Sequence, residues 1–363
     1  MNSYLRSLFL VFCAGTILAA CEAPASRRPA EAVQSNADAW RGVVQAIDSS
    51  PLEDLTVLVG TGDGIVFSHS KGRSTPNTVY KLASSSKWLS AAVLMQLVEQ
   101  NVLALTDHPQ DHISWWTDDP SDARSQITLQ QLLSFTSGFT SRVFTVRCAG
   151  DPEVTLENCA QVIYADRFEF APGTAYYYSN THLHIAAVMA EHATGQPFAE
   201  IFEEQLAQPL SLKDTALLHP SIQNPRPAGG GESTATEYAL FLAALLNKQF
   251  LADSFERMAY DYIDPQTDIA YSPLTQQGYE WHYGFGQWRE CLAAAWEAHC
   301  DEQVIVSSPG AFGFYPYLHM DKGYFVVIAM MEPWGLFTNA SGRSVEFGLD
   351  LRPIIEAALG QGE

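Results

Sequence analysis

The sequence is short of basic side chains. Its 363 residues include 20 Lys and Arg against 41 Asp and Glu, which gives a formal net charge of −21 at pH 7. Proteins bind nucleic acid by displacing the counterions of phosphates with Lys and Arg. This balance argues against nucleic acid as a partner and weakly disfavours polyanionic substrates.

Short motifs that mark metal sites and one large class of hydrolases are also missing. No C-x-x-C or H-E-x-x-H spacing supports a zinc site. His182 and His184 are two positions apart on a predicted helix, so they point to different faces and cannot chelate an ion together. There is no G-x-S-x-G motif, which argues against the α/β-hydrolase fold. We therefore expect neither a metal nor an organic cofactor.

The N-terminal apolar stretch, residues 8–20, has the length of a signal-peptide core and is short for a membrane-spanning helix. It runs into the letters LAAC, which resemble the lipobox of bacterial lipoproteins, where the cysteine carries lipid after cleavage. We predict a signal peptide at 1–20, a lipid on Cys21 and a flexible tether at 21–39. An ordinary cleaved signal peptide is the alternative. Glu22 favours the outer membrane, so we expect a periplasmic, lipid-anchored protein.

Cysteine is scarce, and each of the six cysteines can be given an expected role. Cys13 leaves with the signal peptide, and Cys21 is the lipid site. An exported protein meets an oxidising compartment, where disulfides are the expected state of the other four. Each local pair would close a loop of about ten residues and stabilise the fold by roughly 2–3 kcal/mol. The two predicted disulfides are Cys148–Cys159 and Cys291–Cys300.

Strands are predicted at both ends of the mature chain and helices in its middle. The segment 55–72 alternates strand, Gly-rich turn and strand, which predicts a hairpin. Aromatic and Gly-rich segments between 281 and 331 are typical of antiparallel strands. Periodicity and capping signals predict helices at 87–103, at 128–138 with Gly138 as the terminating residue, at 181–195 ending in Gly195, at 233–249 with a Thr234–Glu237 capping box, and at 343–359 interrupted by Pro353.

These elements predict an α+β fold. An antiparallel sheet is built from both chain ends and flanked by helices, with an inserted, mainly helical subdomain at about 100–250. The whole domain is expected to span 40–360. The sequence makes no prediction of the oligomeric state.

Three consecutive serines, Ser84, Ser85 and Ser86, precede Lys87. If a helix opens near Ser84, only this serine lies one turn before Lys87 on the same face. A serine hydroxyl needs a nearby base and a stabilised oxyanion to act as a nucleophile, and a lysine with a depressed pKa can serve as that base. The alternative is a capping serine beside a surface lysine.

Four later segments favour the catalytic interpretation. The motifs LLSFTSGF (132–139), PGTAYYYSN (172–180), NPRPAGGGESTATEYALFLAALLN (224–247) and YGFGQW (283–288) follow the S-x-x-K motif in order. Together they resemble the serine β-lactamase superfamily, most closely its class C-like esterases, D-peptidases and penicillin-binding proteins. The resemblance covers about residues 40 to 355.

The resemblance assigns roles to individual residues. Ser84 matches the acylated nucleophile and Lys87 its hydrogen-bonded partner. Tyr178 and Asn180 match the family's Y-x-N element, in which the tyrosine relays protons and the asparagine orients substrate and lysine. A tyrosinate base requires a pKa well below its ordinary value, so we expect Lys87 to supply positive potential beside Tyr178.

The third family motif, usually K-T-G or H-x-G, is replaced here by Ser308-Pro309-Gly310. We expect Ser308 and Gly310 to border the substrate, with Gly310 allowing close approach of the substrate backbone. The N–H groups of Ala311 and Ser84 are the expected oxyanion donors. A simple turn at the start of a strand is the alternative.

The resemblance implies a serine hydrolase that forms an acyl-enzyme on Ser84. The expected substrates are small esters or amides. A D,D-peptidase or penicillin-binding protein that takes D-peptides, and a non-catalytic binding lipoprotein on the same scaffold, are the alternatives. A strand motif without a lysine implies weak activity on β-lactams, whose carboxylate would lack a cation.

Overall fold

The computed structural model describes residues 38–293, 295–332 and 338–360. The predicted signal peptide, Cys21 and nearly all of the tether lie outside these residues. Within the described ranges, no helix has both the length and the hydropathy that crossing a membrane requires.

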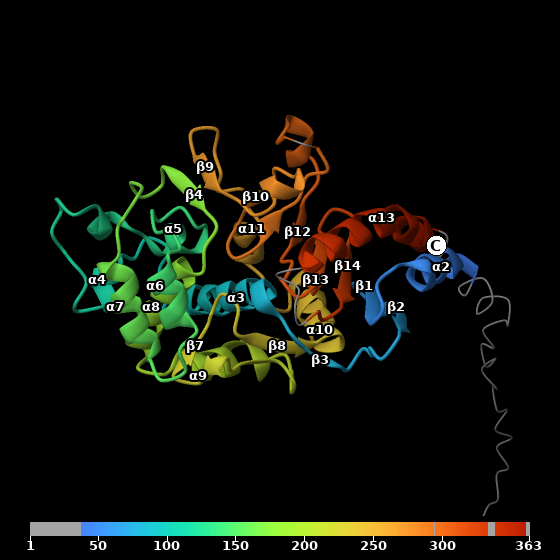
Figure 1. The fold of residues 1–363 in the computed structure, drawn as a ribbon, viewed down its shortest axis with the longest axis horizontal. Coiled ribbons are helices and arrows are strands. Elements are labelled where there is room, and N and C mark those ends of the chain that lie inside the picture. The colour runs from blue at the N-terminus through green and yellow to red at the C-terminus, as the bar shows by residue number, and fades with distance from the viewer. Residues whose placement is uncertain (1–37, 294, 333–337, 361–363) are drawn as a thin grey trace, which may run out of the picture.

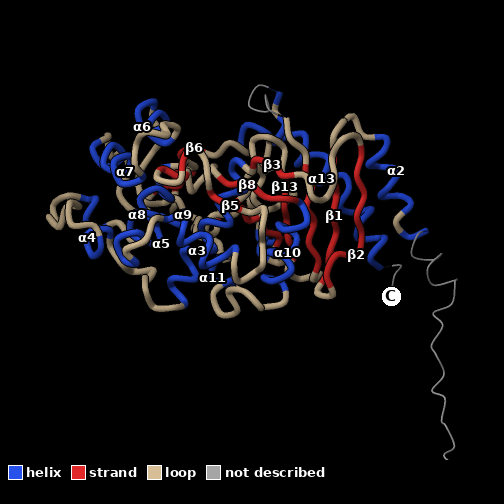
Figure 2. Tube along the Cα trace, turned by 90° about the horizontal axis from the view of Figure 1, so that it is seen from below, coloured by secondary structure: helices blue, strands red, loops and turns tan. Residues whose placement is uncertain are grey.

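A seven-stranded antiparallel sheet forms one half of the molecule (Figure 2). In spatial order its strands are β10 (His282–Tyr283), β11 (Trp288–Arg289), β12 (Ile305–Ser307), β13 (Tyr315–His319), β14 (Tyr324–Ala329), β1 (Leu55–Thr61) and β2 (Gly64–Lys71). The first hairpin therefore joins the last strand, with Val57 opposite Ile328. This confirms the predicted sheet built from both chain ends.

Helices cover both faces of this sheet (Figure 1). Helix α10 (Ala235–Leu246) packs against β14 and β1, while α13 (Ala340–Gly360) packs against β13 and against α2 (Arg41–Ser49). Because both faces are covered, every residue of β14 is buried. Such strands are apolar throughout and do not alternate with polar residues.

The second half of the molecule is mainly helical and lies at the left of Figure 1. Its helices and turns are η1 (Ala83–Ser85), α3 (Ser86–Glu99), α4 (Pro109–His112), η2 (Ala123–Gln126), α5 (Leu129–Leu133), α6 (Val143–Ala149), α7 (Leu156–Ala165), α8 (Thr181–Thr194), α9 (Phe198–Phe202) and η3 (Glu203–Ala207). The short elements α11 (Phe255–Met258) and η4 (Thr275–Gln277) precede β10 in the chain, and η5 (Ala298–Asp301) lies between β11 and β12. Helices α3 and α8 are almost wholly buried and pack against each other.

Short strands join the two halves. They are β3 (Val79–Lys81), β8 (Gly231–Thr234) and β5 (Ala216–Leu217) in one sheet, β4 (Ala175–Tyr177) with β9 (Asp268–Tyr271) in a parallel pair, and β6 (Pro220–Ser221) with β7 (Asn224–Pro225) in another pair. Strand β3 leads directly into η1 and α3, so this small sheet fixes where the serine-rich turn begins.

Helix ends agree with the sequence in part. Gly195 ends α8 in the left-handed conformation, as predicted. Helix α5 instead ends at Leu133, because Phe135 takes a positive φ of 60°, so the prediction for Gly138 is wrong. Helix α13 runs through Pro353, and the predicted interruption is wrong as well. The proline lies on the exposed side, and the lost hydrogen bond does not end a helix whose other face is buried.

The capping box at the start of α10 forms only in half. The Thr234 hydroxyl accepts a hydrogen bond from the N–H of Glu237, as the spacing predicts. The Glu237 carboxylate does not reach back. It accepts hydrogen bonds from the N–H groups of Lys213 and Asp214 and from the Thr215 hydroxyl. A long-range contact therefore outcompetes the local one.

Candidate active site

The serine-rich turn is held from two sides. The Leu82 N–H donates to the carbonyl of Gly231 at 2.9 Å, and Ala83 adopts a positive φ of 46° just before the serines. Positive φ is unfavourable for a residue with a Cβ, so surrounding contacts must hold this backbone. Strain of this kind is concentrated at functional sites, and here it directly precedes Ser84.

The three serine hydroxyls have different partners. Ser85 is buried and donates to the carbonyl of Ser308 at 2.5 Å. Ser86 is also buried and accepts from the Gly231 N–H at 2.9 Å. Only Ser84 is partly exposed, and Lys87 Nζ donates to its Oγ at 3.1 Å. The geometry therefore selects Ser84 as the hydroxyl that can meet a substrate.

Lys87 is the centre of the site. Its side chain is 1% exposed, and Nζ donates to three oxygens: Ser84 Oγ, Asn180 Oδ1 at 2.9 Å and the Ala228 carbonyl at 2.8 Å. Burial, assisted by the positive charge of Arg226, lowers the pKa of Lys87 to about 7. A substantial fraction is therefore neutral at physiological pH, and a neutral amine can accept the proton of Ser84.

Tyr178 lies beside this pair. Its ring stacks on Trp288 with centroids 5.0 Å apart, and Lys87 Nζ lies 4.8 Å from the Tyr178 ring centroid. Burial raises the pKa of Tyr178 above its ordinary value, and the neighbouring Ser84 hydroxyl opposes this rise less strongly. The expectation of a tyrosinate is therefore wrong for the free protein, because desolvation is the largest effect on the pKa of Tyr178. Tyr178 is a neutral phenol that can donate a proton.

Asn180 is the residue immediately before α8. Its side-chain oxygen holds Lys87, and its backbone carbonyl pairs with Nδ1 of His184 at 3.2 Å. His182 is likewise tied, to Ser137 Oγ and to the Tyr177 carbonyl. Burial lowers the pKa of both histidines to about 4. Both are packing residues that stay neutral near pH 7.

The Ser308-Pro309-Gly310 segment follows β12 and lies against the serine turn. Ser308 is 3% exposed, and its hydroxyl donates to the Ser84 carbonyl at 3.1 Å. It therefore supports the nucleophile's backbone, and its predicted contact with the substrate stays a prediction. A Cβ on Gly310 would lie 2.1 Å from the Leu82 carbonyl, so the close approach served by this glycine is to the protein itself. Ala311 is partly exposed, and its role as an oxyanion donor stays a prediction.

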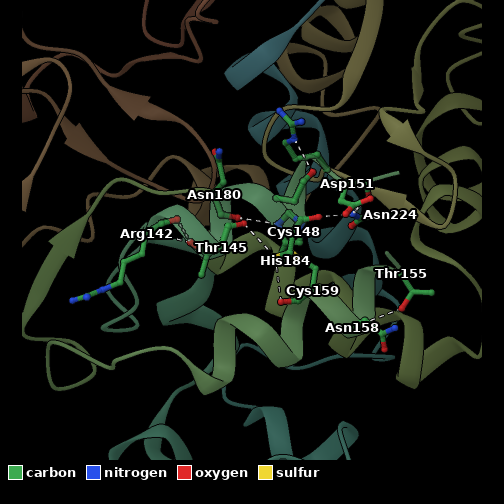
Figure 3. Close-up of a disulfide and its surroundings, with 12 residues drawn as sticks. Arg142, Thr145, Cys148, Asp151, Thr155, Asn158, Cys159, Asn180, His184 and Asn224 are labelled. Atoms are coloured by element: carbon green, nitrogen blue, oxygen red, sulfur yellow. Dashed lines mark hydrogen bonds between the residues drawn. A yellow bond between two sulfur atoms is a disulfide. The ribbon is translucent and has the colours of Figure 1, made fainter. Parts of the chain in front are cut away.

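Both predicted disulfides are present in the structure. Cys148–Cys159 joins α6 to α7, and Figure 3 shows Asn180 and His184 close to this bridge. Cys291–Cys300 closes the loop after β11. His299 lies near the second bridge, but both sulfurs are bonded to each other, so this group is no ready metal site.

Sequence reasoning missed Ala228, Trp288 and Arg226 as parts of the site. Ala228 contributes only its carbonyl, which any residue carries. Trp288 lies in the quoted YGFGQW motif, and Arg226 lies in NPRPAGGG beside Ala228. Their positions inside recognised motifs were the available signal.

Curated proteins match parts of this chain. Protein flp of Staphylococcus aureus (strain MW2) is 23% identical over 195 residues, which are 54% of this chain and 39% of that protein. The D-alanyl-D-alanine-carboxypeptidase/endopeptidase AmpH of Escherichia coli (strain K12) is 28% identical over 142 residues, 38% of this chain and 37% of AmpH. The chain thus spans about two fifths of these curated relatives.

Solved structures share the fold. The hydrolase EstCE1, described as having promiscuous acyltransferase activity, superposes with a TM-score of 0.70 at 19% identity, over 90% of this chain and 99% of its own. A putative β-lactamase from Bacteroides dorei gives a TM-score of 0.66 at 24% identity, over 81% and 90%. The Beta-lactamase family model matches residues 43–344, and the chain therefore belongs to this family of serine hydrolases.

Proposed function

We propose that this protein is a serine hydrolase that forms an acyl-enzyme on Ser84 and acts on small esters or amides. The observation that carries the proposal is Lys87, which is buried, has a pKa near 7 and lies 3.1 Å from the Ser84 hydroxyl. Burying an amine costs free energy, so a fold that needed only a side chain to fill this space would be about as stable with an apolar residue there. A catalytic role explains why the buried residue is a lysine.

In the first stage, neutral Lys87 Nζ takes the proton of Ser84 as Oγ attacks the substrate carbonyl. The resulting oxyanion accepts hydrogen bonds from the N–H groups of Ser84 and Ala311. Tyr178 donates its phenolic proton to the leaving oxygen or nitrogen, and the Lys87 ammonium then returns a proton to Tyr178. The leaving group departs as a neutral alcohol or amine, and Ser84 carries the acyl group as an ester.

In the second stage, a water molecule attacks the acyl-enzyme. Lys87, again neutral, takes a proton from this water directly or through Tyr178, and the second tetrahedral intermediate collapses to release the acid. Ser84 Oγ recovers its proton from the Lys87 ammonium. The cycle uses side chains and backbone N–H groups of this chain and returns each side chain to its starting protonation state.

The test is turnover of p-nitrophenyl butyrate by the purified protein, with labelling by a fluorophosphonate and mass spectrometry of the adduct. We expect ester hydrolysis and one adduct, on Ser84. Ser84→Ala should abolish both. An unlabelled protein that hydrolyses no ester would instead favour a binding lipoprotein on this scaffold.

A D,D-peptidase is the second candidate. Its support is the similarity to AmpH, whose name describes a D-alanyl-D-alanine carboxypeptidase and endopeptidase. Release of D-alanine from a D-alanyl-D-alanine peptide, measured on the same preparation, separates the two. A kcat/KM for the peptide well above that for the butyrate ester would favour the peptidase.

We also propose that the protein is lipid-anchored in the periplasm through Cys21. The support is the LAAC stretch and the signal-like segment before it. Metabolic labelling with an alkyne fatty acid in a bacterial host should tag the wild type. The Cys21→Ala variant should remain untagged.

A further inference from the structure

A cavity of about 280 Å³ lies beside the predicted catalytic residues. Its wall includes Thr145 from α6, Asn180 and His184 at the start of α8, and Arg226 from the segment after β7. Thr145, Asn180 and His184 lie together in Figure 3. Ligand pockets commonly have volumes of about 300–1,000 Å³, so this cavity suits a short group.

Arg226 gives the cavity its charge. Among the described residues that line the cavity, Arg226 is the one charged side chain, and none of them is Asp or Glu. Every other described arginine that is not exposed has a carboxylate within 4.0 Å; these are Arg124, Arg142, Arg289, Arg343 and Arg352. Arg226 has no such partner among the described residues, although the chain carries 41 acidic residues against 20 basic ones. A half-buried cation without a counter-charge calls for an explanation, because desolvating a charge costs free energy.

The guanidinium of Arg226 is oriented by its backbone neighbours. Its Nε donates to the Ala149 carbonyl at 3.1 Å, and Nη2 lies 3.6 Å from the position of a Cβ on Gly150. Ala149 and Gly150 both line the cavity. Over the described part of the chain, no acceptor pairs with the two Nη groups, which leaves a fork suited to a carboxylate.

His184 adds a second unsatisfied group. It is fully buried, Nδ1 pairs with the Asn180 carbonyl, and Nε2 has no partner within the described ranges. Because burial lowers the pKa of His184 to about 4, the ring is neutral near pH 7. With a proton on Nδ1, Nε2 is a hydrogen-bond acceptor and does not compete with Arg226 for an anion.

The cavity adjoins the nucleophile through one side chain. Asn180 lines the cavity, and its Oδ1 accepts from Lys87 Nζ, which in turn contacts Ser84 Oγ. A leaving group must diffuse away after the first stage, whereas the acyl group stays on Ser84 until water attacks. A small cavity that Asn180 connects to Lys87 and Ser84 therefore suits the group that stays.

We propose that this cavity binds the acyl part of the substrate and that Arg226 pairs with a carboxylate at the far end of it. The substrate class is then an ester or amide of a short dicarboxylic acid, attacked at its uncharged end. The inference rests on the proposed acylation of Ser84 and deepens it.

The experiment compares mono-p-nitrophenyl glutarate with p-nitrophenyl butyrate on the full-length protein. We expect a higher kcat/KM for the anionic ester. Arg226→Gln should lower the ratio of anionic to neutral kcat/KM by roughly 10- to 100-fold, the range for a hydrogen bond to a charged group. Arg226→Lys should restore part of it. Because any effect of Arg226 on Lys87 acts on both esters, the ratio isolates recognition of the acyl carboxylate.

The matched control is Arg147→Gln, which removes an exposed cation from the same region. It should leave the ratio unchanged. Equal ratios in the wild type and Arg226→Gln, or an equal fall in Arg147→Gln, would overturn the inference. The inference would also be overturned if Arg226→Gln lowered kcat/KM only for p-carboxyphenyl butyrate, whose charge lies on the leaving group. Absence of turnover with both esters, and of labelling by the fluorophosphonate, would overturn the proposed function itself, and this inference with it.

Discussion

Lys87 makes the activity depend on pH in a defined direction. Ordinary lysine has a pKa of 10.5, and burial with the help of Arg226 lowers that of Lys87 to about 7. In the proposed mechanism the neutral amine is the active form, so kcat/KM for a neutral ester should rise with pH and level off above about 7. The sign follows because raising the pH removes the proton that would block the base.

The size of the effect can be worked out from these two values. At pH 7, a lysine of pKa 10.5 is neutral in about one molecule in 3,000, whereas one with a pKa near 7 is neutral in about half. Burial therefore supplies roughly a thousandfold more active base. Arg226 is the second cause after burial, so Arg226→Gln should move the acid limb to higher pH by only a minor part of the total change.

The assay is kcat/KM for p-nitrophenyl butyrate from pH 5 to pH 9 at constant ionic strength. The release of p-nitrophenol is read at its isosbestic wavelength, and thermal unfolding is recorded at each pH. Arg147→Gln serves as the control, because its cation is exposed and should leave the midpoint unchanged. Protonation of His182 or His184 cannot cause the loss of activity below pH 7, because burial lowers the pKa of both histidines to about 4.

Two results would refute this reasoning. Activity that stays level down to pH 5 would mean that Lys87 is not the base. A midpoint in Arg226→Gln that is unchanged or shifted to lower pH would mean that Arg226 does not act on Lys87 electrostatically.

Three further predictions follow from the serine turn and the strand beside it. Ser84→Ala should abolish fluorophosphonate labelling, whereas Ser85→Ala should keep it and lose about 1–3 kcal/mol of stability in urea unfolding, because the Ser308 carbonyl loses its buried donor; an adduct on Ser85 would contradict the assignment. The kcat/KM for a cephalosporin should fall well below that for the butyrate ester, since the Ser308 hydroxyl is occupied by the Ser84 carbonyl and offers no charge; comparable values would show that another group binds the β-lactam carboxylate. Gly310→Ala should lower both the melting temperature and the ester activity, because its methyl group would lie 2.1 Å from the Leu82 carbonyl oxygen. A variant with the melting temperature and activity of the wild type would show that the backbone of the turn can shift to make room for the methyl group.

The parts of the site that could be predicted from the sequence are the local ones. Ser84 and Lys87 are three positions apart on one helical turn, so their contact follows from helix geometry alone. Tyr178 and Asn180 needed the family motif, because nothing local brings residue 180 to residue 87. The sheet from both chain ends followed from the order of strand-like and helix-like segments.

The parts that could not be predicted depend on burial and on backbone groups. Ser308, just after β12, donates its hydroxyl to the Ser84 carbonyl, a backbone contact that no side-chain motif could indicate. The pKa of Tyr178 depends on how completely its neighbours exclude water, which a motif does not record. The same holds for Arg226, because its lack of a carboxylate partner among residues 38–293, 295–332 and 338–360 depends on where the chain places each Asp and Glu.

The sheet order also determines which circular permutants of the chain could fold. Helices α2 and α13, the first and last of the described helices, pack against each other although they lie at opposite ends of the chain (Figure 1). A linker between those ends, with new termini opened at the exposed residues 264–266, would give a circular permutant. Its strands β10 to β14 would run directly through α13 and α2 into β1 and β2, so all seven strands would become consecutive in the chain. Lower contact order speeds folding, so we expect the sheet of this circular permutant to form before its helical half has folded.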